Sequence, residues 1–149
     1  INATNNTVCP AATATRDLSI TNTNTSTSSA VVWLQTTAGA DGATNNTIKN
    51  CNIAGSGNTQ TLIGLGAGSS TISISSLGTG NNNNSFINNA ISKTQVGIYS
   101  QGASTANKNS GTIINQNNIN TVAPDNVRKI GILVGFENSI SISKSILTP

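Results

Sequence analysis

The segment Asn45-Asn-Thr-Ile-Lys-Asn-Cys-Asn-Ile53 recurs, with substitutions, as Asn83-Asn-Ser-Phe-Ile-Asn-Asn-Ala-Ile91 and as Gly111-Thr-Ile-Ile-Asn-Gln-Asn-Asn-Ile119. A more diverged fourth copy is Ser139-Ile-Ser-Ile-Ser-Lys-Ser-Ile146. In the first three copies an apolar residue is followed five positions later by isoleucine, as Ile48/Ile53, Phe86/Ile91 and Ile114/Ile119. Apolar residues that return at equivalent places in a repeat indicate repeats that stack on one another.

A second motif lies between these copies. It consists of Ile63-Gly-Leu65, Val96-Gly-Ile98 and Ile130-Gly-Ile132, whose glycines are 33 and 34 residues apart. Val31-Val-Trp-Leu34 occupies the corresponding place in the first repeat. Two independent motifs therefore return with the same order, and each repeat is predicted to carry at least two short strands.

This pattern predicts an all-β fold, a right-handed parallel β-helix of about four to five coils. Short alternations such as Leu18/Ile20, Ile72/Ile74 and Ile140/Ile142 are typical of strands. Asparagine suits the corners because it tolerates left-handed backbone angles, and stacked asparagines can form amide ladders. The glycine-rich stretch 66–70 is expected to form a corner. We expect residues 1–149 to be a single segment with a partial coil at each end, an internal piece of a longer chain.

The amino-acid composition excludes some classes of function. Only 7% of residues are charged and the net charge is +3, while about two residues in five are Asn, Thr or Ser. The basic residues are dispersed, whereas a nucleic-acid interface clusters them and adds aromatic side chains, so no nucleic-acid partner is expected. No run of about 18 apolar residues is present, so no membrane-spanning helix is expected. The seven basic residues are Arg16, Lys49, Lys93, Lys108, Arg128, Lys129 and Lys144.

The residues that usually carry catalysis are scarce. The chain has no histidine, which excludes a Ser-His-Asp or Cys-His site, and two cysteines are too few for a zinc site. We therefore predict no enzyme, no catalytic residue, no bound metal and no cofactor. A polysaccharide lyase or hydrolase would need acids brought together by the fold, because glycoside hydrolysis uses a pair of carboxyl groups. The four acids are dispersed as Asp17, Asp41, Asp125 and Glu137.

Aromatic and cysteine residues supply the candidate sites. Phe86 holds an apolar position of the repeat and is predicted to lie in the core, whereas Trp33 and Tyr99 are equally compatible with core and surface. On a surface, Trp33 and Tyr99 could stack on sugar rings, so they are the candidate glycan contacts. Cys9 and Cys51 could form a disulfide in an oxidising compartment, although a buried thiol is the simpler interpretation of Cys51.

Several stretches resemble long secreted β-helix repeat proteins of Bacteroidota. The resemblance covers nearly the whole chain, and it departs from the family pattern at Cys9-Pro10. It implies an extracellular or cell-surface location and association with type IX secretion, and it implies no catalytic residues because the shared motif is structural. It is carried by Arg16-Asp-Leu-Ser-Ile-Thr-Asn-Thr-Asn24, Ser29-Ala-Val-Val-Trp-Leu-Gln35, Asp41-Gly-Ala-Thr-Asn-Asn-Thr-Ile-Lys-Asn50, Val96-Gly-Ile-Tyr-Ser-Gln-Gly-Ala-Ser104 and Gly135-Phe-Glu-Asn138.

Three functions are compatible with these observations. The first is a non-catalytic structural segment of an extracellular fibre or adhesin-like protein, whose partners are flanking coils of the same polypeptide or end-to-end copies of itself. The second is a carbohydrate-binding module that recognises a polysaccharide through its corners. The third is a polysaccharide lyase or hydrolase, which the four dispersed acids disfavour.

Overall fold

The computed structural model describes residues 5–8, 15–39 and 41–148. All regular secondary structure in these residues is β-strand, and every strand pair in the sheets is parallel. The predicted all-β class with parallel strands is confirmed.

Three main sheets each take one strand from successive repeats. Sheet 1 contains β1 (Thr7–Val8), β4 (Thr47–Lys49), β7 (Ser85–Ile87), β11 (Ile113–Asn115) and β15 (Ser141–Ser143). Sheet 2 contains β2 (Leu18–Thr21), β5 (Cys51–Ala54), β8 (Ala90–Ser92), β12 (Asn118–Asn120) and β16 (Ile146–Thr148). Sheet 3 contains β3 (Ala30–Gln35), β6 (Ile63–Gly68), β9 (Thr94–Gln101) and β13 (Val127–Gly135). A small sheet joins β10 (Asn109–Ser110) to β14 (Glu137–Asn138).

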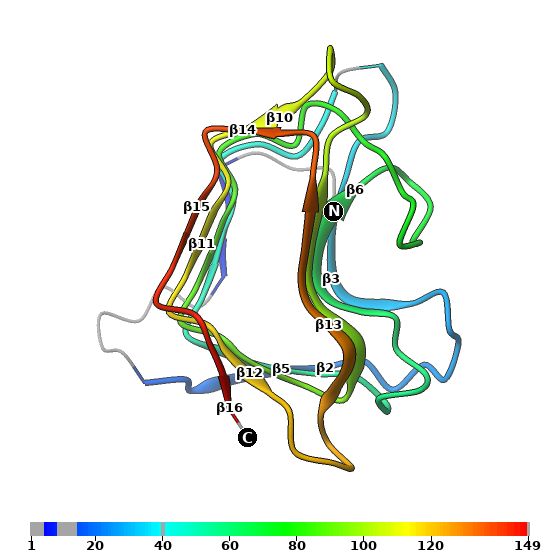
Figure 1. Cartoon of the computed structure of the whole chain (residues 1–149), viewed down its shortest axis with the longest axis vertical. Coiled ribbons are helices and arrows are strands. Elements are labelled where there is room, and N and C mark those ends of the chain that lie inside the picture. The colour runs from blue at the N-terminus through cyan, green and yellow to red at the C-terminus, as the bar shows by residue number, and fades with distance from the viewer. Residues whose placement is uncertain (1–4, 9–14, 40, 149) are drawn as a thin grey trace.

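The chain passes through sheets 1, 2 and 3 in that order and then returns to sheet 1. We call one such passage a coil, so that β1–β3, β4–β6, β7–β9 and β11–β13 belong to four coils and β15–β16 begin a fifth. Figure 1 shows the three sheets as three sides around a common interior. Strands from neighbouring coils pair along each side, which puts equivalent residues of the repeats directly beside one another.

Three apolar ladders fill the interior. Ladder 1 runs through sheet 1 as Val8, Ile48, Phe86, Ile114 and Ile142. Ladder 2 runs through sheet 2 as Ile20, Ile53, Ile91, Ile119 and Leu147. Ladder 3 runs through sheet 3 as Val32, Leu65, Ile98 and Ile132. The repeat pairs found in the sequence therefore lie in register, and the core position predicted for Phe86 is confirmed by its complete burial.

Asparagines turn the chain at the corners between the sheets. Asn45 and Asn83 precede sheet 1 with φ angles of 56° and 55°, and Asn50 and Asn88 follow it with 57° and 50°. These angles lie in the left-handed region, which asparagine adopts more readily than most residues. Gly111 has φ 71° at the position that corresponds to Asn83. The predicted use of asparagine at corners is confirmed.

Buried amide side chains add hydrogen bonds along the stack. The Asn89 backbone N–H and side-chain Nδ2 both donate to Asn117 Oδ1, at 3.0 and 3.1 Å. The Asn117 Nδ2 donates in turn to the Phe86 carbonyl at 2.8 Å. Asn46 and Asn84 form the same arrangement one corner earlier, with both Asn46 donors on Asn84 Oδ1. These ladders supply partners for backbone groups at corners, where strand pairing ends.

The glycine motif is in register in sheet 3. A Cβ on Gly64 would lie 2.7 Å from the Gly97 carbonyl oxygen, and one on Gly97 would lie 2.6 Å from that of Gly131. A side chain at either position would collide with the backbone of the next coil, which explains why glycine returns at this point in each repeat.

Two sequence predictions in this region are wrong. The expected corner at 66–70 begins too early, because Gly66–Gly68 complete strand β6. The expected strand at Ile72 and Ile74 lies instead in a loop over 69–79 with no strand, and Ile74 is 51% exposed. Serine side chains hold this loop through local hydrogen bonds, such as Ser75 N–H to Ser73 Oγ at 3.1 Å. Such bonds compete with strand pairing.

Candidate functional site

The two predicted glycan contacts lie beneath the 69–79 loop. Trp33 is 7% exposed and Tyr99 is fully buried, with ring centroids 5.6 Å apart. They occupy sheet 3 on either side of Gly66, and a Cβ there would lie 2.5 Å from the Trp33 ring. The loop caps both rings, because Trp33 Nε1 donates to the Ser69 carbonyl at 2.9 Å and Tyr99 Oη donates to the Ser76 carbonyl at 2.8 Å.

Of the core and surface placements that the sequence left open for Trp33 and Tyr99, the structure has the buried one for both. Neither ring presents an open face on which a sugar could stack, because their polar atoms are bonded to the loop that covers them. Burial raises the pKa of Tyr99 to about 12 despite the hydrogen bond to Ser76, as expected for a phenol that loses its hydration. The pair anchors the 69–79 loop to sheet 3.

The predicted disulfide cannot be placed, because Cys9 lies outside the described residues. Cys51 is buried at the start of β5, and its Sγ lies 3.1 Å from the Lys49 carbonyl oxygen. Its backbone N–H donates to Asn89 Oδ1 at 3.1 Å, so Cys51 stands at the head of the amide ladder formed by Asn89 and Asn117. The predicted burial of Cys51 is confirmed, while its pairing with Cys9 stays a prediction.

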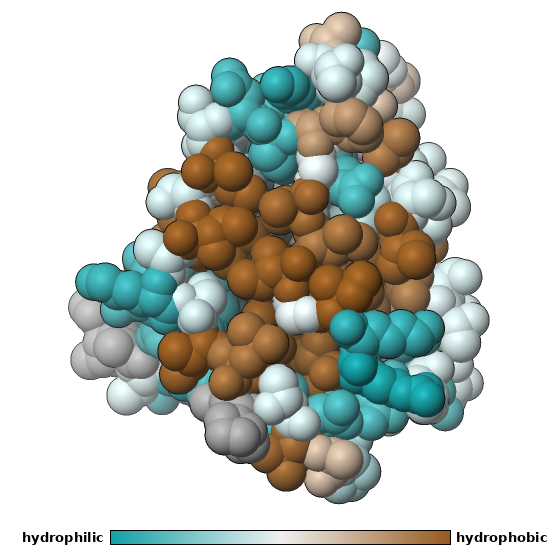
Figure 2. Space-filling view, in the orientation of Figure 1, coloured by the Kyte–Doolittle hydropathy of each residue, from teal (hydrophilic) through white to brown (hydrophobic). Residues whose placement is uncertain are grey.

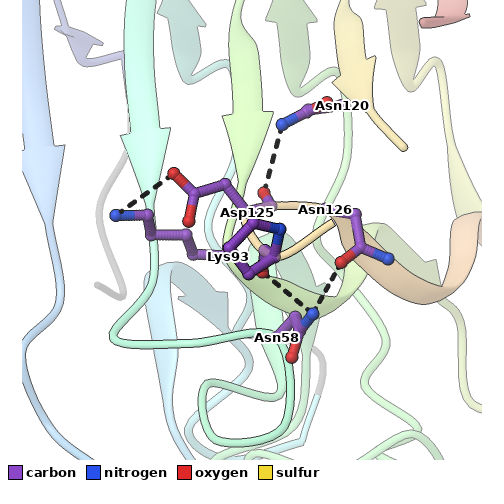
Figure 3. Close-up of polar contacts among 6 residues, drawn as sticks. Asn58, Lys93, Asn120, Asp125 and Asn126 are labelled. Atoms are coloured by element: carbon purple, nitrogen blue, oxygen red, sulfur yellow. Dashed lines mark hydrogen bonds and ion pairs between the residues drawn. The ribbon is translucent and has the colours of Figure 1, made fainter. Parts of the chain in front are cut away.

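Asp125 belongs to a polar cluster at the corner between sheets 2 and 3 (Figure 3). Its carboxylate lies 3.5 Å from the Lys93 ammonium, and its carbonyl accepts a hydrogen bond from Asn120 at 3.3 Å. Asn58, from the corner before β6, donates to the Asn126 side chain at 2.6 Å. These contacts connect the loop 121–126 to Lys93 and Asn58, which belong to preceding coils. Their role is to hold this loop in place.

Glu137 occupies a more enclosed position in β14. Its two carboxylate oxygens accept hydrogen bonds from the Ser100 and Thr112 hydroxyls, at 2.5 and 3.0 Å. Burial raises the pKa of Glu137 above its ordinary value, and the two hydroxyl donors offset part of that rise. The Glu137 carboxylate is thus held by the Ser100 hydroxyl of β9 and by the Thr112 hydroxyl of the corner before β11.

The other two acids, Asp17 and Asp41, lie on the surface. Asp17 is exposed and accepts a hydrogen bond from Thr15 at 2.7 Å, and Asp41 is exposed at the corner after β3. Within the residues that the structure describes, no three acid or cysteine side chains are grouped in a way that could hold a metal ion.

The C-terminal end of the stack is apolar. Figure 2 shows a broad hydrophobic area on the face that is nearest the viewer, where Figure 1 places β13, β15 and β16. Ile142 is 47% exposed and Leu147 is 59% exposed, whereas Ile114 and Ile119, one coil earlier in the same ladders, are fully buried. The C-terminal end, defined here as β13, β15 and β16, therefore displays the side chains that every preceding coil covers.

The N-terminal end, defined as β1, β2 and β3, is hollowed. A cavity of about 230 Å³ opens between β1 and β3, with Val8, Val32, Leu34 and Ile48 among its lining residues. Asn6, Thr7, Asn46 and Thr47 complete its wall. Among the described residues, the three strands at each end have a neighbour on one side only, since they are the outermost in their sheets. In the described part of the chain, the two ends are therefore where apolar side chains and strand edges are least covered.

Sequence reasoning found the ladders but did not identify which of their members would be exposed. It also did not identify Glu137 as an enclosed carboxyl group, although the position of Glu137 within the repeat could have indicated its burial. Glu137 pairs in register with Asn109, and Asn109 Oδ1 accepts the Asn81 backbone N–H at 3.1 Å. Glu137 therefore occupies a place that asparagine holds in the two preceding coils.

No protein-family model, curated protein or solved structure matched the chain when it was compared with them. The described residues also include no helix with the length and apolar character needed to cross a bilayer.

Proposed function

We propose that the chain is a segment of a right-handed parallel β-helix that serves as a non-catalytic shaft in an extracellular or cell-surface fibre or adhesin-like protein. The single observation that carries this proposal is the register of the three apolar ladders, which repeats from coil to coil. A shaft has the same cross-section along its whole length. Each of its coils presents an apolar surface that the next coil covers.

The ladders support a repeating mechanical role over a local binding role. Ile53, Ile91 and Ile119 are each at most 1% exposed, while Leu147 in the same ladder is 59% exposed. An apolar side chain left in water forgoes about 1.5–3 kcal/mol that burial would provide. Within the described residues each coil thus covers the apolar side chains of its neighbour, and this repeated coverage is what a shaft segment requires.

Polysaccharide binding and cleavage receive less support. The aromatic candidates Trp33 and Tyr99 are covered by the 69–79 loop, and the acids Asp125 and Glu137 are engaged by separate corner residues. The extracellular location and the origin in Bacteroidota rest on the sequence resemblance alone. A surface that is rich in Asn, Ser and Thr and poor in charge is compatible with that location.

Two measurements test the function. Antibodies raised against the chain should label intact cells of the source organism, and labelling that appears only after lysis would refute a surface shaft. The chain should also neither bind a glycan array nor release reducing ends or unsaturated products from a polysaccharide panel. Binding or cleavage that survives substitution of the four acids or two aromatic candidates by their neutral or aliphatic counterparts would point to a site elsewhere. Any specific binding or cleavage would count against a purely structural role.

A further inference from the structure

We propose that Thr23, Thr25 and Thr27 are acceptors for O-linked sugars on loop 22–29, which joins β2 to β3. The proposal rests on the extracellular shaft function and deepens it, because it assigns a modification to the surface of the shaft. It draws on three features of the loop: its projection from the stack, its local hydrogen bonds and its free hydroxyl groups.

Loop 22–29 projects from the side of the stack. In Figure 1, where the three sheets surround the interior, the loop between β2 and β3 extends outward from the corner of sheets 2 and 3. Residues 23–28 are all exposed, whereas Ser29, just before β3, is buried. A loop that points sideways is not covered by the coils above or below it, so its side chains stay accessible along a continuous shaft.

Alternate polar side chains hold the backbone of the loop. Asn22 Oδ1 accepts the Asn24 backbone N–H, and Asn24 Oδ1 accepts the Ser26 backbone N–H, both at 2.8 Å. Ser26 Oγ accepts the Ser28 backbone N–H at 3.2 Å. Asparagine and serine commonly make such bonds to the backbone two residues further along the chain. The loop therefore has a defined local structure although it contains no strand.

Two further hydrogen bonds attach the loop to the stack. Asn22 Nδ2 donates to the carbonyl of Ala30, the first residue of β3, at 2.8 Å. Ser56, from the corresponding corner of the next coil, donates through its hydroxyl to the Asn24 carbonyl at 2.8 Å. These bonds hold the loop in a defined orientation beside the corner of sheets 2 and 3.

The threonines between these residues take no part in that network. Thr23, Thr25 and Thr27 are exposed, and their hydroxyl groups make no hydrogen bond to another described residue. By contrast, the hydroxyl groups of Ser73 and Ser75 in the 69–79 loop bond to each other at 3.0 Å. A hydroxyl group that the fold does not use can react without the loss of a stabilising contact. The projecting loop thus presents three available hydroxyl groups at alternate positions.

The reaction is the transfer of a sugar from an activated donor to threonine. The threonine Oγ1 attacks the anomeric carbon of a sugar that is carried on a diphosphate leaving group. The new C–O bond replaces the bond to the diphosphate, which leaves with the bonding electron pair, and the hydroxyl proton passes to a base of the transferase. The chain supplies only the acceptor hydroxyl, so the reaction needs no catalytic residue from it.

The charge pattern favours a sugar over a phosphate on these hydroxyl groups. A phosphate is usually stabilised by cationic side chains, and no charged residue lies between Asp17 and Asp41 in the sequence. Attached sugars are bulky, uncharged and solubilising. Because only 7% of the residues are charged, the chain has few charged groups that could keep neighbouring shafts apart by repulsion. Sugars on a projecting loop would provide that separation.

Mass spectrometry of the chain isolated from its source organism tests the proposal. Trypsin cleaves after Arg16 and Lys49, so residues 17–49 form one peptide that contains the whole loop. We expect this peptide to carry sugar, and fragmentation that preserves glycosidic bonds should locate the sugar on Thr23, Thr25 or Thr27. Peptide 94–108 is the internal control and is expected to be unmodified, since Thr105 is its single exposed threonine and has no acceptor threonines beside it.

A triple variant with Thr23→Val, Thr25→Val and Thr27→Val removes the hydroxyl groups and keeps the branched shape of the side chains. Expressed in the source organism, it should lose the sugar from peptide 17–49, whereas the matched control Thr105→Val should keep it. A triple variant with serine at the same three positions should also keep it, because serine retains a hydroxyl group. All variants should unfold in urea at the wild-type midpoint, since no hydrogen bond of the fold is lost.

A wild-type peptide 17–49 without sugar would overturn the proposal. Sugar on the Asn24 amide, phosphate on the threonines, or sugar that persists in the valine variant would overturn it as well. The failure of the shaft function is distinguished by the antibody labelling of intact cells. Labelled cells whose chain carries no sugar would overturn only the modification, whereas a chain that is neither labelled nor modified would overturn both.

Discussion

The amide ladder through Asn117 makes a quantitative prediction about stability. Asn117→Ala removes the acceptor of the Asn89 backbone N–H and the donor to the Phe86 carbonyl, at 3.0 and 2.8 Å. Asn89, Asn117 and Phe86 are all fully buried, so water cannot readily replace the lost side chain as a hydrogen-bond partner. The variant should therefore leave the Asn89 backbone N–H unsatisfied within an otherwise intact stack, whereas the Phe86 carbonyl keeps its strand pairing with β11.

The expected loss follows from the one backbone group left unpaired. A buried donor or acceptor without a partner costs about 1–3 kcal/mol, so Asn117→Ala should lower the free energy of unfolding by about 1–3 kcal/mol. That is an appreciable share of the roughly 5–15 kcal/mol by which a domain is usually stable. Asn117→Ser should cost less, because Ser145, one coil later in the same register, already accepts the Asn117 N–H through its hydroxyl at 3.3 Å.

Urea unfolding followed by far-ultraviolet circular dichroism measures the effect. The midpoint should fall in the order wild type, Asn117→Ser, Asn117→Ala, with little change in the slope of the transition. Asn107→Ala is the control, because Asn107 is exposed in a loop and its amide bonds only locally to Ser104. It should change stability by about 0.5 kcal/mol or less. If Asn117→Ala cost no more than Asn107→Ala, the ladder would not stabilise the stack and the argument would be wrong.

Three further predictions address the core, the aromatic cover and the enclosed acid. Ile114→Ala should cost about 2–5 kcal/mol and Ile142→Ala less than about 1.5 kcal/mol in urea unfolding of the monomer, because only Ile114 is fully buried. Gly66→Ala should displace the ring of Trp33, the single tryptophan, and red-shift its fluorescence, whereas an unchanged spectrum would contradict the packing. Because burial raises the pKa of Glu137, the folded state binds its proton more tightly than the unfolded state does. Stability from this group should be present below the unfolded pKa and be lost as pH rises through the folded one, and Glu137→Gln should remove that dependence in pH-resolved unfolding.

The sequence determined the elements that repeat. Ile48, Phe86 and Ile114 could be aligned without a structure because every coil places an apolar residue against the same neighbours, so the pattern returns with the coil. The glycines at 64 and 97 could be aligned for the same reason, since a side chain there would meet the next backbone. Contacts that recur in every coil require similar residues at regular intervals along the sequence. This regularity was sufficient to predict an all-β architecture with parallel strands.

Only the tertiary structure decided the features that occur once. Trp33 and Tyr99 share the outer side of sheet 3, and alternation within their strands could not reveal that the 69–79 loop would fold over them. The alternation at Ile72 and Ile74 gave a misleading strand signal, because local serine hydrogen bonds there replace pairing with a neighbouring coil. The exposure of Ile142 likewise depends on its being in the last coil rather than on its residue type. A repeat specifies how each coil meets the next, whereas loops and ends depend on contacts that no second copy of the motif records.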